Sequence, residues 1–280
     1  MSEGAVELEE VRGPSALGGG WRRSLELLYL IAVTEFKKTY FGTALGYLWS
    51  VGRPLMLFAV LLAVFTQAFH IGSQVPHYAV LLLLNIVLMG FFQEATSGAV
   101  DSIVVQEGVV RKTKFPRIVI PLSVVLTSLF NLSLNLLVAF VFILAFGVSP
   151  MWTWLLFPVV FGLLFVLTIA MSMILSSLFP RFRDVGVIWS VLAAALFYAT
   201  PVIYAIQILP ETIRHLIFIN PLTPLFVLVQ KWVINPHAPS PSEAAGGYAL
   251  LLVPAAIFVA LCVFAVWIFN REAPRIAEEL

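Results

Sequence analysis

Residues 118 to 180 (IVIPLSVVLTSLFNLSLNLLVAFVFILAFGVSPMWTWLLFPVVFGLLFVLTIAMSMILSSLFP) form a stretch of 63 residues that contains no charged side chain. A helix that crosses the hydrocarbon core of a bilayer needs about 20 mostly apolar residues, and its backbone polar groups must be paired internally. The stretch is long enough for two such helices, and Gly147, Ser149 and Pro150 supply a turn between them. It therefore predicts two membrane-spanning helices, over about residues 118–146 and 152–178.

Other apolar stretches predict four more spans. The sequence from Pro54 to Gln93 also lacks charge and is interrupted by turn-prone residues between His70 and His77, which indicates helices over about 50–69 and 78–100. Two further runs predict spans over about 185–205 and 248–270. Of the 280 residues, 61% are hydrophobic and 11% are charged, against roughly 25% charged residues in a soluble domain. We therefore expect an all-α membrane protein with a six-helix transmembrane domain at residues 48–270.

The Lys and Arg residues are divided unevenly between the two sides of this predicted bundle. Fourteen of the 16 lie on the side of the termini: Arg12, Arg22, Arg23, Lys37, Lys38, Arg53, Arg111, Lys112, Lys114, Arg117, Arg181, Arg183, Arg271 and Arg275. Arg214 and Lys231 lie on the other side. Because Lys and Arg accumulate on the cytoplasmic side of membrane proteins, we expect both termini in the cytoplasm, with tails at residues 1–20, which we expect to be flexible, and 271–280.

Residues 21–47 precede the first span and begin with an amphipathic pattern. Trp21, Leu25, Leu28, Ala32 and Phe36 recur at spacings of three and four, as expected for one apolar face of a helix. The uncharged part of this segment is too short to cross a membrane, so we expect the helix to lie in the cytoplasmic interface. Simple anchoring to the membrane explains this pattern equally well.

The cytoplasmic connection at residues 101–117 (DSIVVQEGVVRKTKFPR) is longer than a turn between two spans requires. Its acidic residues come first and its basic residues last, before Phe115 and Pro116. A short helix parallel to the membrane that docks a partner fits this segment, and so does a plain solvated connector.

The segment between the last two spans faces outward, yet it is too apolar for a solvated loop. Prolines at positions 210, 221, 224 and 236 divide it into pieces of about ten to fourteen residues, which are too short to span. We expect two half-helices that re-enter the outer leaflet over residues 207–236. Because broken helices are tolerated in membranes only beside protein or a water-filled cavity, this segment is the expected exit of a transport pathway.

The apolar spans contain little chemistry for an enzyme. Glu94 is the ionisable residue within them, and we expect a gate-side or snorkelling carboxylate or, alternatively, a proton relay. The sequence has no G-x-x-x-x-G-K-[ST] motif for nucleotide phosphates and no Gly-Lys dipeptide. Its single cysteine, Cys262, excludes an internal disulfide. If ATP drives transport, another polypeptide must hydrolyse it.

Three motifs resemble those of type-2 ABC exporter permeases, most closely the permeases for O-antigen polysaccharides and teichoic acids. The resemblance covers about residues 30 to 270. The motifs are Phe36-Lys37-x-x-Tyr40-x-x-Thr43-x-Leu45-Gly46-x-x-Trp49 with Arg53-Pro54, then Arg111-Lys112-x-x-Phe115-Pro116 with Pro121, and Phe179-Pro180-Arg181-Phe182-Arg183-Asp184. Thr200-Pro201-Val202-Ile203-Tyr204 and Asn220-Pro221-Leu222-Thr223-Pro224 support the outer half.

The resemblance implies a homodimer in the bacterial inner membrane with a channel between the protomers. Two ATPase subunits would dock on the cytoplasmic side and bind ATP and Mg²⁺, with no cofactor on this chain. The implied substrate is a polyprenyl-diphosphate-linked glycan. A drug or lipid exporter of the same architecture is one alternative, and a membrane scaffold or channel without an ATPase is another.

The same resemblance suggests roles for individual residues, each with a simpler alternative. Contact with the ATPase is expected at Arg111, Lys112, Arg181, Arg183 and Asp184, although a structural turn explains the last three equally well. Lys37, Lys38 and Arg53 are expected near the anionic diphosphate, or they reflect membrane topology alone. Phe197, Tyr198 and Tyr204 are expected to face sugar rings in the channel, or to form an ordinary interfacial belt.

Overall fold

The computed structural model describes residues 21–40, 46, 48–68, 70, 75–106, 108 and 116–272, and within these ranges the regular structure is entirely helical. The longer helices are α1 (Trp21–Tyr40), α2 (Leu48–Gln67), α3 (Tyr78–Val100), α6 (Val119–Ala145), α7 (Phe157–Leu178), α8 (Asp184–Ala199) and α12 (Tyr248–Glu272). The short elements are α4 (Ser102–Val105), η2 (Trp152–Leu156), η3 (Ile206–Ile208), α9 (Glu211–Ile217), α10 (Thr223–Val229), the π-helical η4 (Gln230–Ile234) and α11 (Pro241–Ala245).

Five of the described helices are long and apolar enough to cross a membrane, namely α2, α3, α6, α7 together with η2, and α12. Helix α8 has 16 residues and is shorter. It ends before the limit of 205 expected from hydropathy, because Thr200 adopts an extended backbone with φ −103° and ψ 145°. A residue that precedes proline is disfavoured in the helical region, and Pro201 follows Thr200.

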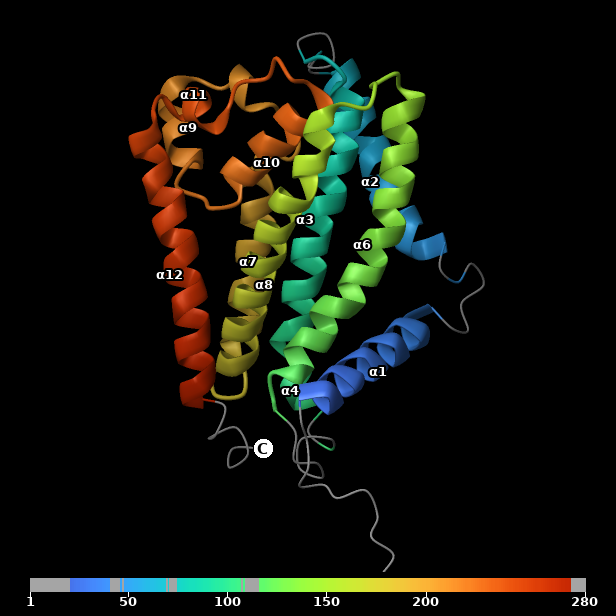
Figure 1. The fold of residues 1–280 in the computed structure, drawn as a ribbon, viewed down its shortest axis with the longest axis vertical. Helices are drawn as coiled ribbons and strands as arrows, with labels where there is room; N and C mark the ends of the chain where they lie inside the picture. The colour runs from blue at the N-terminus through green and yellow to red at the C-terminus, as the bar shows by residue number, and fades with distance from the viewer. Residues whose placement is uncertain are drawn as a thin grey trace, which may run out of the picture.

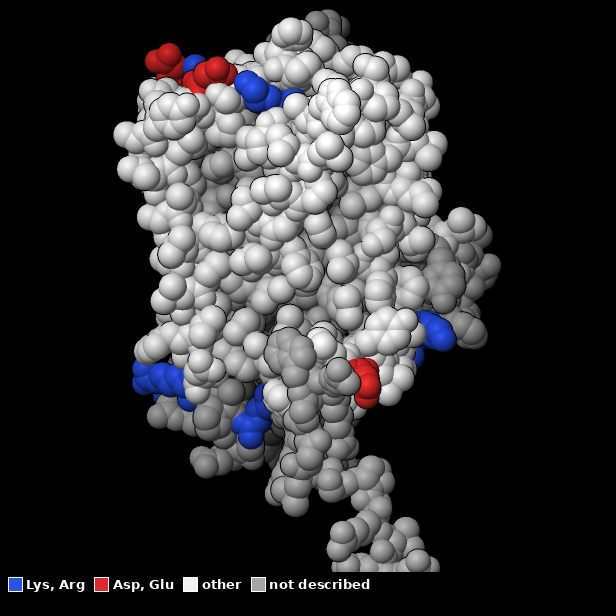
Figure 2. Space-filling model, viewed as in Figure 1, with Lys and Arg blue, Asp and Glu red and all other residues white. Residues whose placement is uncertain are grey.

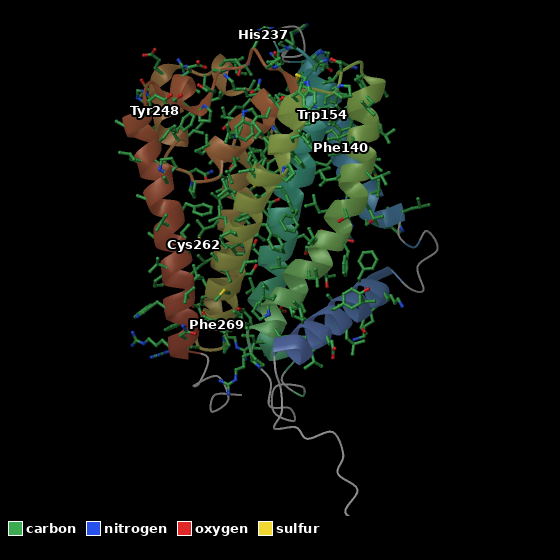
Figure 3. The ribbon with its side chains drawn as sticks, viewed as in Figure 1. Phe140, Trp154, His237, Tyr248, Cys262 and Phe269 are labelled. Atoms are coloured by element: carbon green, nitrogen blue, oxygen red, sulfur yellow. The ribbon has the colours of Figure 1, made fainter. Side chains whose placement is uncertain are left out.

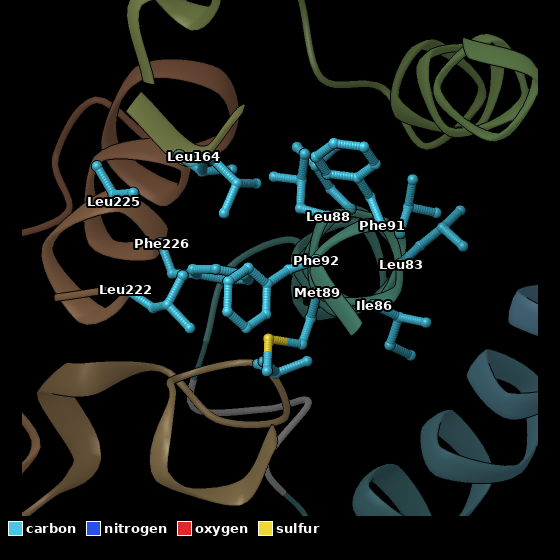
Figure 4. Packing of buried hydrophobic residues seen from close by; sticks show 14 of the residues in the cluster. Leu83, Ile86, Leu88, Met89, Phe91, Phe92, Leu164, Leu222, Leu225 and Phe226 are labelled. Atoms are coloured by element: carbon cyan, nitrogen blue, oxygen red, sulfur yellow. The ribbon is translucent and has the colours of Figure 1, made fainter. Parts of the chain in front are cut away.

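Helix α3 lies at the centre of the bundle, where α2, α6, α7 and α8 pack around it (Figure 1). Most of its side chains are buried, whereas Gly90, Glu94, Ser97 and Gly98 form one exposed face. Figure 4 shows Phe92 and Met89 directed towards Leu222 and Phe226 of the α10 region. Phe91 also stacks on Phe165 of α7, with 6.3 Å between the ring centroids. This apolar packing makes α3 the core helix of the fold.

Helix α1 lies obliquely across the lower part of α6 in Figure 1. Ala32 is fully buried, and Phe36 packs edge-on against Phe130 of α6 with 5.7 Å between the centroids. The hydroxyl of Thr127 also donates a hydrogen bond to the Ala32 carbonyl oxygen over 3.2 Å. The expected apolar positions Ala32 and Phe36 therefore face α6, whereas Leu25 is exposed.

The segment from Thr200 to Gly247 folds into short helices at the opposite end of the bundle from α1, which we call the α9 end (Figure 1). Where hydropathy predicted pieces of ten to fourteen residues, the structure has the seven-residue α9 and the twelve residues of α10 with η4. Asn220 Nδ2 donates to Thr200 Oγ1 over 2.8 Å, and Asn220 Oδ1 accepts from the Leu222 N–H over 3.0 Å. One asparagine therefore fixes the turn between these pieces onto the end of α8.

Side chains from the long helices pair with backbone carbonyls that the broken helices leave free. Tyr78 donates to the Ile203 carbonyl over 2.7 Å, and Asn85 donates to the Pro201 carbonyl over 2.9 Å. At η4, Trp154 donates through Nε1 to the Val233 carbonyl over 2.9 Å. Trp154 is itself held against Phe140 of α6 (Figure 3). Because an unpaired carbonyl in an apolar interior is costly, these contacts stabilise the irregular backbone.

Candidate functional site

A polar cavity of about 490 Å³ lies where α2, α3, α6 and α8 meet. Its polar lining residues are Ser50, Arg53, Gln93, Glu94, Ser97 and Asn135, and its apolar wall includes Phe91 and Phe197. We call this the central cavity. Its charged and amide groups lie among helices that are otherwise apolar, and polar residues inside such bundles commonly mark a functional pathway.

Two asparagines of α6 hold the polar groups of the central cavity in place. Asn131 donates through Nδ2 to a carboxylate oxygen of Glu94. Asn135, one helical turn later, donates to the carbonyl oxygens of Asn131 over 2.9 Å and Ser50 over 3.1 Å. Proline has no N–H group, so Pro54 cannot bond to the carbonyl four residues before it, which belongs to Ser50. The Asn135 amide takes the place of that missing helix bond.

The remaining wall of the cavity comes from α8. Gln93 donates through Nε2 to the Ala193 carbonyl oxygen over 2.7 Å. Phe197 follows one turn after Ala193 and lines the cavity together with Arg53, whose side chain is exposed. Arg53 therefore places a cation at a cavity that also contains hydrogen-bond acceptors and an aromatic ring.

Glu94 borders a second cavity as well. This space of about 240 Å³ extends towards α1 and α4 and is also lined by Glu35, Asp101, Gln106 and Thr127. The Glu94 carboxylate is thus shared by the central cavity and by a more acidic cavity at the end of the bundle where α1 lies. The expectation of a gate-side or snorkelling carboxylate and its alternative, a proton relay, are both compatible with this position.

The three cations expected near an anionic head group are found in different surroundings. Arg53 lines the central cavity. Lys37 and Lys38 lie in the last turn of α1 with exposed side chains, and Lys38 forms an ion pair with Glu35 over 2.9 Å. Neither Lys37 nor Lys38 lines the central cavity.

The three expected channel aromatics lie together at the end of α8. The rings of Phe197 and Tyr198 meet edge-on, with 5.4 Å between their centroids. The hydroxyl of Tyr204 donates to the Tyr198 carbonyl oxygen over 3.0 Å. Phe197 lines the central cavity, whereas the Tyr198 side chain is 65% exposed and lies outside that lining.

The turn between α7 and α8 exposes the residues expected to contact a partner. The guanidinium of Arg183 lies over the ring of Phe179 at 5.1 Å, and that of Arg181 lies over Phe182 at 5.3 Å. Asp184 begins α8, where a carboxylate interacts favourably with the helix dipole. Arg111 and Lys112 lie outside the residues that the structure describes.

Sequence reasoning did not assign Ser50, Gln93 or Asn131 to a site. The spacing of Ser50 and Pro54 shows that one carbonyl of α2 needs a partner from another element, and this signal was available in the sequence. The partner itself, Asn135, is 85 residues away along the chain, and no local pattern identifies it.

Comparisons with known proteins agree with this picture of a membrane permease. Residues 26–233 match the family model described as "ABC-2 type transporter". The chain is 30% identical over 256 residues to the O-antigen export system permease protein RfbA of Myxococcus xanthus, a match that covers 91% of this chain and 95% of the relative. It is 28% identical over 257 residues to the protein of the same name from Klebsiella pneumoniae, with the same coverage. These matches confirm the resemblance seen in the motifs, and the chain belongs to the ABC-2 type transporter family as a multi-pass membrane permease.

Proposed function

We propose that this chain is the permease subunit of an ATP-driven exporter that moves a polyprenyl-diphosphate-linked polysaccharide, such as an O-antigen or a teichoic acid, across the bacterial inner membrane. The supporting observation is the similarity to O-antigen export permeases over 91% of the chain. Two copies of the chain form the channel. Two copies of a separate ATPase subunit bind ATP and Mg²⁺ and drive the cycle.

The proposed topology has six crossings with both termini in the cytoplasm. Helix α8, with 16 residues, is about 24 Å long, and we propose that it makes the fifth crossing of a core about 30 Å thick together with the turn that follows it. Helices α9 and α10 with η4 then re-enter the outer leaflet. The carbonyl pairing by Tyr78, Asn85 and Trp154 meets the requirement for irregular backbone at membrane depth.

The charge distribution supports this orientation. Figure 2 shows Lys and Arg side chains at both ends of the molecule. At the end near α1 the described Lys and Arg side chains belong to Lys37, Lys38, Arg53, Arg117, Arg181, Arg183 and Arg271. At the α9 end they belong to Arg214 and Lys231. An excess of Lys and Arg indicates the cytoplasmic side.

In the proposed pathway, the diphosphate head group meets Arg53 in the central cavity after passing the lysines of α1. The glycan then moves along Phe197, Tyr198 and Tyr204, whose rings offer flat apolar surfaces to sugars. The turn at Arg181, Arg183 and Asp184, together with Arg111 and Lys112, contacts the ATPase.

Depletion of this chain in its native bacterium tests the proposal directly. We expect the surface glycan to fall and its lipid-linked precursor to accumulate in the cytoplasmic leaflet, measured by lipid extraction and glycan analysis. Unchanged pools would favour a drug or lipid exporter. If no ATPase co-purifies with the tagged chain and no ATP-dependent activity appears, a scaffold or channel is the better explanation.

The role of Arg53 has a separate test. Arg53→Gln removes the cation from the central cavity, and we expect surface glycan to fall about tenfold, because a charged hydrogen bond to phosphate is lost. Arg53→Lys should restore part of the export. Arg271→Gln is the matched control, since Arg271 is an exposed cation of the same end on α12 and does not line the cavity. Equal export by Arg53→Gln and the control would contradict this role.

A further inference from the structure

An apolar groove of about 460 Å³ lies between α7, α10, α11 and α12, away from the central cavity. Every side chain that lines it is apolar, and four of the lining residues are Pro221, Pro224, Pro241 and Pro254. Proline has no N–H group to present to a ligand. We call this space the proline groove.

The proline groove exists because α10 is short. Near the α1 end, α7 and α12 pack closely through the small residues Ala170 and Ala265. Towards the α9 end, the third neighbour is α10 with η4, which has only twelve residues and is about 18 Å long. Leu163 of α7 and Phe258 of α12 therefore line a space that no full-length helix fills. Apolar cavities stay dry and take apolar ligands.

The surroundings of the proline groove supply such a ligand. Both α7 and α12 are long enough to span a membrane. On α12 the large hydrophobic residues Leu252, Val253 and Val259 are exposed beside the groove, so this part of the helix faces hydrocarbon chains. Tyr248, which begins the helix, is 80% exposed and suits the interface at the α9 end (Figure 3).

Positive charge lies next to the upper end of the groove. Arg214 and Lys231 are the Lys and Arg residues of the α9 end in the described part of the chain. Lys231 reaches Glu243 of α11 over 3.6 Å, and Arg214 belongs to α9, which packs on α11. Pro241, the first residue of α11, lines the groove. Figure 2 shows charged side chains gathered over this corner.

Each of these two cations has one acidic neighbour. The Arg214 guanidinium is 3.8 Å from Glu211, and its Nε atom is buried without a hydrogen-bond partner among the described residues. The ion pair between Lys231 and Glu243 involves an exposed carboxylate, and such pairs contribute little. A guanidinium and an ammonium each carry several N–H donors, so a single acidic neighbour leaves Arg214 and Lys231 with further donors for a phosphate group.

We propose that the proline groove binds an acyl chain of an anionic phospholipid from the leaflet at the α9 end, with the lipid phosphate at Arg214 and Lys231. In the orientation proposed above, this is the outer leaflet. The lipid fills the space that the short α10 leaves between α7 and α12. The site is separate from the pathway of the exported substrate.

Photolabelling of the purified full-length protein in nanodiscs tests this proposal. The probe is phosphatidylglycerol with a diazirine in the middle of one acyl chain. We expect labelled peptides at residues 221–228 and 251–259, mapped by mass spectrometry. Labelling spread evenly over α12, including the exposed Val263 and Phe264 outside the groove, would show ordinary bilayer contact and overturn the proposal.

Neighbouring alanines provide a matched pair of variants. Ala255 lines the groove, whereas Ala256 is also exposed but does not line it. Ala255→Phe should lower labelling of residues 221–228 about tenfold, because the ring displaces methylene groups of the lipid. Ala256→Phe should change it by less than about twofold. Val259→Trp and its control Val263→Trp repeat this comparison at two other exposed positions. Equal labelling within both pairs would overturn the proposal.

The head group has its own test. Labelling by the phosphatidylglycerol probe is competed with unlabelled phosphatidylglycerol or phosphatidylcholine. We expect stronger competition by phosphatidylglycerol for the wild-type chain, and loss of that preference in the double variant Arg214→Gln, Lys231→Gln. A preference that survives in the double variant rules out the phosphate site. If polyprenyl diphosphate displaces the probe better than phosphatidylglycerol does, the groove belongs to the exported substrate, and the phospholipid proposal is wrong.

Discussion

Helices α3 and α12 have nearly the same length, with 23 and 25 residues, yet the fold uses them in opposite ways. Helix α3 lies at the centre of the bundle, and most of its side chains are buried. Helix α12 lies at its edge, and few of its side chains, such as Ala265 and Phe269, are buried (Figure 1). Length and hydropathy identify both as candidate spans, but they do not distinguish the two positions.

The two helices also differ in their polar side chains. Tyr78, Asn85 and Gln93 of α3 each donate a hydrogen bond to a backbone carbonyl between Ala193 and Ile203. Between Tyr248 and Asn270, α12 contains only Cys262 as a polar residue. Helix α3 is therefore fixed by directional bonds, whereas α12 is held against α7 by apolar packing. The polar residues of α3 thus mark its contacts with the segment from Ala193 to Ile203.

The largest expected effect comes from Asn85, which is fully buried. Asn85→Leu leaves the Pro201 and Val202 carbonyls without their partner, while it also removes the unpaired Asn85 Oδ1. We expect a net loss of about 3 kcal/mol, measured as a lower Tm of the protein in detergent. The control is Thr96→Val, because the equally buried Thr96 hydroxyl bonds to Phe92 of its own helix. Similar Tm values for the two variants would contradict a special role of bonds between elements.

The stability of the contact between α7 and α12 should depend on the size of the side chains in it rather than on their polarity. Ala265 is 1% exposed and lies in the cluster with Ala170 and Met173 of α7. Ala265→Leu inserts methylene groups into this contact and should lower stability by about 2 kcal/mol. Val263→Leu, on the exposed face of the same helix, should change it by less than about 0.5 kcal/mol. Equal Tm shifts in the two variants would contradict close packing at Ala265.

Helix α2 provides an intermediate case, because it is largely exposed and yet has a polar connection to α6. Asn135→Leu removes the Asn135 bond to the Ser50 carbonyl beside the central cavity, where water can partly replace the lost bond. We therefore expect a smaller loss of about 1 kcal/mol. Ser133→Ala is the control, since Ser133 is exposed and bonds within its own helix. A loss as large as that of Asn85→Leu would mean that the cavity excludes water.

The smallest effect is expected just before α12, where a capping box at Ser240 and Glu243 begins α11. The Ser240 backbone N–H, the Ser240 side chain and Lys231 hold the pKa of Glu243 below its usual value of 4.5. Because folding lowers the pKa of Glu243, the ionised carboxylate stabilises α11. This stabilisation is present above about pH 4.5 and is lost as the pH falls through the pKa of Glu243 in the folded protein. Hydrogen-exchange protection of residues 244–247 should decrease in that range. Glu243→Gln should remove the pH dependence, and an unchanged dependence would contradict its assignment to Glu243.

Much of the helical fold could be predicted from the sequence, because uninterrupted apolar runs identify long helices without knowledge of their neighbours. The end of α8 could not be predicted this way. Apolar residues continue through Val202 and Ile203, so hydropathy extends the helix to residue 205, whereas the extended backbone at Thr200 ends it. The carbonyls freed there are bonded by Asn85, which is 116 residues away from Pro201.

Less of the candidate site than of the fold could be predicted from the sequence. Arg53 and Phe197 were expected near the pathway for different reasons, and the structure places both in one cavity. The bond between Asn131 and Glu94 joins residues 37 positions apart on separate helices. Periodicity shows which face of a helix is polar, but it does not show which helix lies opposite.

The three donors of α3 also set an order of events for any movement of the segment after α8. Tyr78, Asn85 and Gln93 lie about two turns apart along one helix and bond to successive parts of the same neighbour. Separation that starts at the α9 end opens the Tyr78 bond first and the Asn85 bond second, and Gln93 remains as the pivot. In such a movement, each broken bond leaves one more backbone carbonyl oxygen without its side-chain donor.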